Sequence, residues 1–413
     1  MVKKRKDEEV RSPSSFVYLT NFHHIDPPYS FPAEISAKFI ASLHVKSQLI
    51  KTPCFTSPIA DKIITILFLL LSISIPTIIS RHSSRTVQLN IFVGLVGLFA
   101  VLLYSWRFYW KSQMETLLSN AISKFGLGDI KRKSFINFLD KESANQIYDL
   151  AVNYAGADLK HRTMLYEKCV NKLFDEFYLN EVVPPTNLIH TTCTGYISPS
   201  PPQTLVSKKN WNDATTVSQI YHMGCAASIP SIRTGGSFVK ETNRRCDIVH
   251  SELTSFHMKP AINTTIQLIV EILFADGAIK YSVLPHPPQP AALHTSGRRK
   301  ASGGGVVGVG GSNKGCTTVS SGSGGFKVLA THEMVIPDSL SSMTWITSNF
   351  GMDMTLSRDV PEKICKELNG FMEYLNMKAG ISDFDPTKCI FAIHPGLFFS
   401  LSFLYLKASS RYP

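Results

Sequence analysis

Two uncharged apolar stretches near the N-terminus are the strongest pattern along the chain. Residues 63–80 carry no charge over 18 positions, and residues 86–106 carry none over 21. A helix of roughly 20 apolar residues crosses the hydrocarbon core of a bilayer, so each stretch predicts a membrane-spanning helix. Only residues 81–85 lie between them, which predicts a transmembrane hairpin inserted within residues 57–112. A pair of buried core helices is the alternative interpretation.

The rest of the chain alternates between short apolar runs and amphipathic segments. Apolar residues at helical spacing predict helices over 113–124, 141–153, 157–179, 262–274 and 360–378. Short apolar runs predict strands at 187–189, 247–249, 327–331 and 389–393. Strands that alternate with helices predict a layered α/β fold.

Shifts in composition divide the chain into six segments. They are a charged tail at 1–14, a first globular segment at 15–56, the inserted hairpin at 57–112, an α/β segment at 113–283, a Pro/Gly-rich linker at 284–326 and a further α/β segment at 327–413. The linker has ten Gly between residues 303 and 325, a composition typical of flexible connections.

Composition and charge exclude several classes of protein. Of the 413 residues, 44% are hydrophobic and 18% are charged, values typical of a chain that buries a core. The net charge of +11 comes from scattered basic residues that are not interleaved with aromatic ones, so we expect no nucleic-acid partner. Anionic lipid or a phosphate-bearing substrate explains the surplus better. Eight irregularly spaced Cys predict neither a disulfide framework nor a metal site, and indicate a reducing compartment.

Cys225 is a candidate nucleophile. Gly224 permits a sharp turn before it, and Pro230 fits the first turn of a following helix. The positive end of a helix dipole lowers the pKa of a nearby thiol and favours the thiolate. A buried structural cysteine is the alternative interpretation.

His394 is the histidine best suited to assist such a thiol. It follows the apolar run 391–393, which predicts an imidazole at the carboxyl end of a strand, where α/β proteins gather their sites. A structural histidine is the alternative. His222 is closer to Cys225 in sequence, but three residues before it, on the entering strand, we expect its side chain to point elsewhere.

Several segments together resemble the bacterial type III polyketide synthases, the chalcone/stilbene synthase family. The resemblance keeps its order over residues 15–56 and 113–396. The segments that carry it are 18–22, 190–201, 221–226, 247–254, 273–277, 336–345 and 392–396.

The resemblance implies a duplicated αβαβα thiolase-like fold, in which 15–56 and 113–283 form the N-terminal half and 327–413 an incomplete C-terminal half. It implies a homodimer that condenses malonyl-CoA onto an acyl-CoA starter held as a Cys thioester, with no further cofactor. Cys225 would be the acylated nucleophile and His394 would stabilise its thiolate. The resemblance also implies residues that line or guard the cavity, namely Thr192, Cys193, Thr194, Phe274 and, near the second gatekeeper position, Met258.

Three features depart from the family pattern. The predicted hairpin interrupts the family-like segments, and the Gly-rich linker enlarges a connection that is normally short. After Gly396 the family continues with Gly and a later catalytic Asn, whereas here Leu397 follows and no Asn occurs after Asn376.

Two alternatives to a type III synthase remain open. The first is a membrane 3-ketoacyl-CoA synthase of fatty-acid elongation, and the second is an inactive membrane protein derived from a synthase. We expect a multi-pass membrane protein that contacts lipid through residues 63–106, with its catalytic part on the cytosolic side, where CoA thioesters are made.

Overall fold

The computed structural model describes residues 16–51, 85–124, 131–262, 264–287, 325–392 and 394. The predicted tail at 1–14 and the first predicted membrane helix at 63–80 lie outside these ranges, as does most of the predicted linker.

Strands and helices alternate along the chain, as the hydrophobic pattern predicts. The strands are β1 (Val17–Ile25), β2 (Tyr29–Pro32), β3 (Lys131–Ser134), β4 (Asn187–Thr192), β5 (Thr216–Tyr221), β6 (Cys246–Leu253), β7 (Asp276–Leu284), β8 (Phe326–Val328), β9 (Met343–Ser348) and β10 (Gly351–Leu356). The helices are α1 (Ala33–Lys51), α3 (Arg85–Lys124), α4 (Lys141–Tyr148), α5 (Leu159–Phe177), α6 (Pro201–Lys208), α7 (Ser228–Thr242), α8 (Thr265–Leu273) and α9 (Val360–Ala379). The predicted helices are thus confirmed, two of them with shorter bounds. The helix predicted at 141–153 ends at Tyr148 as α4, and the helix predicted at 262–274 begins at Thr265 as α8.

A six-stranded mixed sheet forms the centre of the molecule, in the order β5-β4-β6-β7-β1-β8. Strand β4 is parallel to both β5 and β6, and the other pairs are antiparallel. Strand β1 precedes the predicted insertion, yet it pairs with β7 from Tyr18 opposite Leu284 to Ile25 opposite Ala278. The first globular segment therefore belongs to the same sheet as the long α/β segment.

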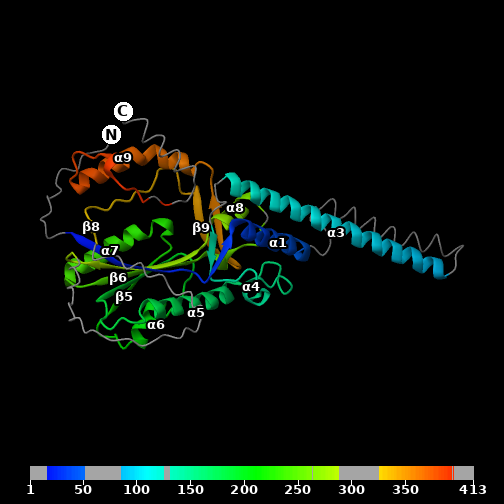
Figure 1. Ribbon diagram of the computed structural model, residues 1–413, viewed down its shortest axis with the longest axis horizontal. Coiled ribbons are helices and arrows are strands. Elements are labelled where there is room, and N and C mark those ends of the chain that lie inside the picture. The colour runs from blue at the N-terminus through cyan, green and yellow to red at the C-terminus, as the bar shows by residue number, and fades with distance from the viewer. Residues whose placement is uncertain are drawn as a thin grey trace, which may run out of the picture.

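Helices cover both faces of the sheet, α7 on one side and α5 with α6 on the other (Figure 1). Successive strand residues point to opposite faces. Leu188 accordingly joins the cluster that includes the α5 and α6 side chains, and Ile189 joins the cluster that includes Val239 of α7. On α7, a Cβ added to Gly235 would lie 3.3 Å from Cys246 Sγ, so glycine permits the close approach of this helix to the sheet.

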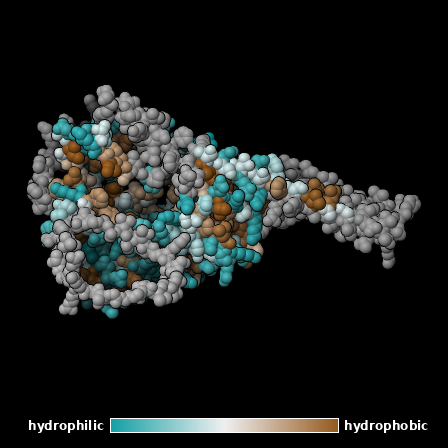
Figure 2. Space-filling view, viewed as in Figure 1, coloured by the Kyte–Doolittle hydropathy of each residue, from teal (hydrophilic) through white to brown (hydrophobic). Residues whose placement is uncertain are grey.

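Helix α3 is 40 residues long and leaves the body of the molecule (Figure 1). Its C-terminal part is anchored, because Met114, Leu118 and Ile122 are buried in the same core cluster as residues of α1 and α8. Large apolar side chains nearer its start are exposed, among them Leu98 and Phe108. Figure 2 shows hydrophobic residues, in brown, on this projecting part of the molecule.

The predicted second membrane helix, 86–106, is helical but forms the first part of α3. Within the ranges that the structure describes, no helix combines the length and the apolarity needed to cross a bilayer. The predicted transmembrane hairpin is therefore not supported.

The described residues after Val328 form a β-hairpin of β9 and β10, helix α9 and a short 3₁₀ turn. The predicted strand at 389–393 is wrong for residues 389–392, which lie outside any strand. A strand needs a neighbour for its backbone hydrogen bonds, and β9 and β10 pair with each other. Among the residues described after Val328, a second αβαβα unit is not present, and the expected incomplete C-terminal half stays a prediction.

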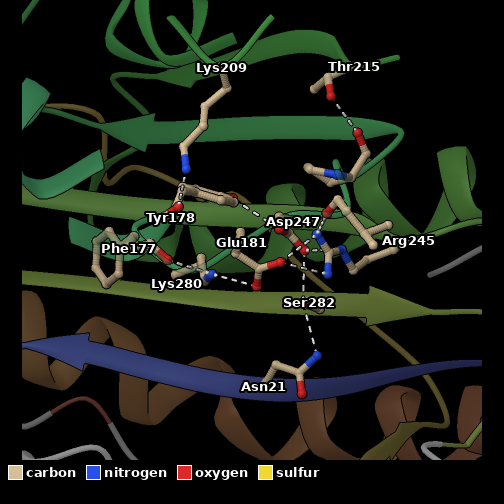
Figure 3. Close-up of polar contacts among 12 residues, drawn as sticks. Asn21, Phe177, Tyr178, Glu181, Lys209, Thr215, Arg245, Asp247, Lys280 and Ser282 are labelled. Carbon is tan, nitrogen blue, oxygen red and sulfur yellow. Dashed lines mark hydrogen bonds and ion pairs between the residues drawn. The ribbon is translucent and has the colours of Figure 1, made fainter. Parts of the chain in front are cut away.

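A charged network fixes the sheet at the end where β6 begins (Figure 3). Asp247 of β6 is fully buried; its carboxylate accepts hydrogen bonds from Tyr178 (3.0 Å) and Ser282 (2.8 Å) and lies 3.3 Å from Arg245 Nε. Glu181 bridges Arg245 and Lys280, at 3.3 and 3.4 Å. We call this set, Tyr178, Glu181, Arg245, Asp247, Lys280 and Ser282, the Asp247 network.

Candidate active site

The segments that contain the predicted site residues Thr192 to Thr194 and Cys225 meet at the carboxyl ends of β4, β5 and β6. Cys193 and Thr194 follow β4, Cys225 follows β5, and Glu252 lies near the end of β6. Adjacent parallel strands end at one edge of a sheet, so the three segments converge there.

Cys225 lies in a tight turn between β5 and α7. Gly224 has φ +65°, a conformation that favours glycine, and a 3₁₀ turn over Gly224–Ala226 leads into α7. The Cys225 side chain is exposed. The predicted sharp turn and the helix start after Cys225 are confirmed.

The predicted direction of the thiol pKa is wrong. The surrounding protein raises the pKa of Cys225 by desolvation, and the negative charge of Glu252 raises it further. Cys225 lies three residues before α7 begins, in the separate 3₁₀ turn, and the field of a helix dipole falls off within its first turn. These surroundings favour the protonated thiol over the thiolate.

Cys193 is a buried neighbour of this turn. Its Sγ accepts a hydrogen bond from the Gly224 N–H at 3.1 Å. Burial and the Glu252 charge raise the pKa of Cys193 to about 12, so the thiol is protonated at neutral pH. This state favours the lining role predicted for Cys193 over that of a second nucleophile.

Thr192 and Thr194 are almost fully buried, and their hydroxyls hold the loop after β4 to β6. Thr192 Oγ1 donates to the Ser251 carbonyl at 2.7 Å, and Thr194 Oγ1 donates to Glu252 Oε2 at 2.9 Å. The loop turns close to Tyr166, because a Cβ added to Gly195 would overlap the Tyr166 ring. These hydroxyls therefore fix the shape of the loop.

Glu252 is a site residue that the sequence analysis did not identify. Its carboxylate accepts from the Cys193 N–H at 2.9 Å and from Thr194, and desolvation raises its pKa to about 7. Its position three residues after the apolar pair Ile248-Val249, near the end of a predicted strand, was a usable signal. A carboxyl group with this pKa changes charge at neutral pH beside both cysteines.

The remaining predicted residues lie in separate segments. Met258 is buried and follows the 3₁₀ turn Thr254–His257, and Arg162 Nη1 donates to its carbonyl at 3.1 Å. Phe274 is half-buried at the C-cap of α8. His394 is exposed and outside any helix or strand, and its pairing with Cys225 stays a prediction.

A cavity of about 650 Å³ lies at the other edge of the sheet, where β4, β5 and β6 begin. Thr186, Thr216 and Arg244 are among its lining residues. It is thus separate from the cysteine-containing edge. In the described ranges, no three His, Cys, Asp or Glu side chains are grouped so as to hold a metal ion.

Comparison with known proteins identifies polyketide synthases as relatives in fold. No family model matches the chain. A curated protein named probable polyketide synthase 1, from Dictyostelium discoideum, is 22% identical over 215 residues, which are 51% of this chain and 6% of that protein.

Several solved structures resemble the chain along most of its length. Germicidin synthase from Streptomyces coelicolor, a type III polyketide synthase, aligns with a TM-score of 0.57 and 15% identity over 97% of this chain and 85% of that one. The type III polyketide synthase domain of Steely1 from Dictyostelium aligns with a TM-score of 0.56 and 14% identity, over 91% of this chain and 77% of that one. At these identities the likeness establishes the fold, which is the mixed α/β, thiolase-like fold of type III polyketide synthases.

Proposed function

We propose that the protein is a type III polyketide synthase-like acyltransferase with Cys225 as its nucleophile. The observation that carries this proposal is the exposed Cys225, presented on a tight turn at the carboxyl edge of parallel strands in a type III synthase-like fold. The segment resemblance around Cys225 and His394 and the curated relative support the same reaction class.

The proposed reaction has two steps. The Cys225 thiolate attacks the carbonyl carbon of an acyl-CoA, a new C–S bond forms, and CoA leaves as a thiol after taking up a proton. Malonyl-CoA then loses CO₂, and the resulting enolate attacks the acyl carbonyl and releases the Cys225 thiolate. Because its surroundings raise the pKa of Cys225, a base must accept the thiol proton, and we assign this role to His394.

Intact mass spectrometry after incubation with a medium-chain acyl-CoA tests the nucleophile. We expect an adduct of one acyl group on the wild-type protein and none on Cys225→Ala. Cys193→Ala is the matched control, since the neighbouring thiol should be dispensable for loading. An adduct that persists in Cys225→Ala, or its absence from wild type across several starters, would refute the proposal.

Products formed with malonyl-CoA separate the reaction classes. Pyrones or resorcinols support the type III synthase. A 3-ketoacyl-CoA extended by two carbons indicates a 3-ketoacyl-CoA synthase, and loading without any product indicates a synthase-derived protein that no longer condenses. We also propose a homodimer, as the resemblance implies, which light scattering after size exclusion tests directly.

We further propose that α3 contacts a lipid surface while the catalytic body lies on the cytosolic side. Leu98, Val101 and Leu102 are each more than half exposed, and the exposed aromatic residues Phe108 and Tyr109 follow them. Apolar and aromatic side chains together are typical of membrane-interface helices. Flotation with anionic vesicles should recover the wild-type protein, and replacing all three aliphatic residues by Ser should abolish this. Equal flotation of the two proteins would refute the contact.

A further inference from the structure

The residue between β5 and the turn that bears Cys225 has an unusual backbone conformation. His222 follows β5 directly and has φ +62°, a conformation that non-glycine residues rarely adopt. Two residues later Gly224 also has positive φ, and Cys225 comes next. A side-chain-bearing residue in this conformation requires contacts that hold it there, and such outliers are concentrated at functional sites.

Three hydrogen bonds hold His222. Its backbone N–H donates to the Thr192 carbonyl at 3.0 Å, which ties the turn to β4. Its ring Nε2 lies 2.7 Å from the Trp345 carbonyl, and its Nδ1 contacts the Tyr196 hydroxyl. The Trp345 carbonyl oxygen only accepts hydrogen bonds, so Nε2 carries a proton and donates to it. The two ring contacts therefore fix the orientation of the His222 imidazole.

Trp345 forms hydrogen bonds with both loops of the site. Its backbone carbonyl accepts from His222, and its indole N–H donates to the Cys193 carbonyl at 2.8 Å. Trp345 lies on β9, so one residue of the C-terminal hairpin joins the turn that bears Cys225 to the loop that bears Cys193. His222 and Trp345 are 123 residues apart in sequence, and the connection exists only in the folded chain.

We propose that His222 is a positioning residue that clamps the nucleophile turn between the Cys193 loop and the β9–β10 hairpin. The assignment rests on the proposed function, since it concerns how Cys225 is presented for acylation. His222 acts through the backbone of the turn and through Trp345, and takes no proton from the substrate. Its loss misplaces the Cys225 thiol relative to the bound thioester.

The rate of Cys225 acylation tests the clamp. Reactions are quenched at set times over a range of acyl-CoA concentrations, and the acylated fraction is measured by intact mass spectrometry. His222→Ala removes both ring contacts, and we expect the maximal acylation rate to fall about 10-fold to 100-fold, as for a misplaced reacting group. The half-saturating acyl-CoA concentration should change far less. His222→Gln retains an N–H donor and a carbonyl acceptor and should restore most of the rate. Tyr196→Phe removes one contact and should give an intermediate rate.

Three controls keep the result interpretable. His161→Ala removes an exposed histidine with one ring contact, to the Gln146 carbonyl, and should leave the rate unchanged. The thermal midpoint of each variant reports folding; if His222→Ala does not fold, Tyr196→Phe and His222→Gln decide the question. An unloaded wild type would refute the proposed function itself. A loaded wild type with equal rates in His222→Ala, or with His222→Gln no faster than His222→Ala, would refute the clamp alone.

Discussion

Strand β6 carries an acidic residue near each end, and the two have opposite surroundings. Asp247, at the start of β6, lies among the cations Arg245 and Lys280 in the Asp247 network (Figure 3). Glu252, near the end of β6, receives hydrogen bonds from the Cys193 N–H and the Thr194 hydroxyl, which are both uncharged. Desolvation raises the pKa of both, but the two cations oppose the shift at Asp247, whereas neutral donors leave Glu252 at about 7.

The comparison shows how one strand serves two purposes. At the edge where β6 begins, opposite charges neutralise one another and hold the sheet together. At the edge where β6 ends, the Glu252 carboxyl group lies beside the cysteines and has a pKa of about 7, so it is partly protonated at neutral pH. Perturbed acids of this kind are concentrated at functional sites.

The largest expected effect is on the Asp247 network. Asp247→Ala removes the buried carboxylate that pairs with Arg245 and accepts from Tyr178 and Ser282, and only Glu181 is left beside Arg245 and Lys280. We expect the free energy of unfolding to fall by about 3–5 kcal/mol. Urea denaturation measures this loss. Asp213→Ala, at an exposed acid of the same sheet edge, should change it by less than about 0.5 kcal/mol. A loss below about 1 kcal/mol in Asp247→Ala would contradict the structural role.

The next effect is a pH dependence at Glu252. Its pKa is about 7 in the folded protein against 4.5 for the unperturbed group, so the folded state holds a proton that the unfolded state has lost. Stability from this group is therefore greatest at low pH and falls as pH rises from about 4.5 to about 7, by at most about 3 kcal/mol. Glu252→Gln cannot titrate and should lack this component. Parallel stability-against-pH curves for the two proteins would refute the raised pKa.

A smaller effect is expected for Tyr178→Phe. The change removes only the hydroxyl that donates to Asp247 at 3.0 Å and keeps the buried ring. A hydrogen bond to a charged group contributes about 2 kcal/mol to the free energy of unfolding. Tyr374→Phe, at a partly exposed tyrosine of α9, is the matched control and should be nearly neutral. Equal denaturation midpoints for the two variants would mean that the hydroxyl is not needed.

The smallest effect concerns the reactivity of Cys225. Because the Glu252 charge raises the pKa of Cys225, Glu252→Gln should lower that pKa. The pH midpoint of Cys225 alkylation by iodoacetamide then moves to lower pH, as followed by peptide mass spectrometry. Glu181→Gln changes an acid at the opposite edge and should leave the midpoint in place. A midpoint that does not move, or moves upward, in Glu252→Gln would show that the two groups are not coupled.

The sequence was most informative where structure is local. Apolar spacing predicted α5 and α9 closely, and the Gly224-Cys225 pair predicted the tight turn before α7. It failed where the outcome depends on distant segments. The run at 389–392 has strand-like residues, but among the described residues no strand pairs with it. The pKa of Cys225 depends on desolvation by the surrounding protein and on Glu252, neither of which a helix-start pattern reveals. The contact of His222 with Trp345 likewise has no local signal.

The uneven anchoring of α3 has a consequence for local unfolding. Buried side chains such as Leu118 and Ile122 hold its last turns to the core, whereas exposed side chains occupy positions near Leu98. Backbone amides open according to the packing around them, so one continuous helix should show a gradient of hydrogen-exchange protection. Amides near Ile122 should exchange with the cooperative body of the protein and those near Leu98 far sooner, so that α3 melts from its projecting end while the sheet stays folded.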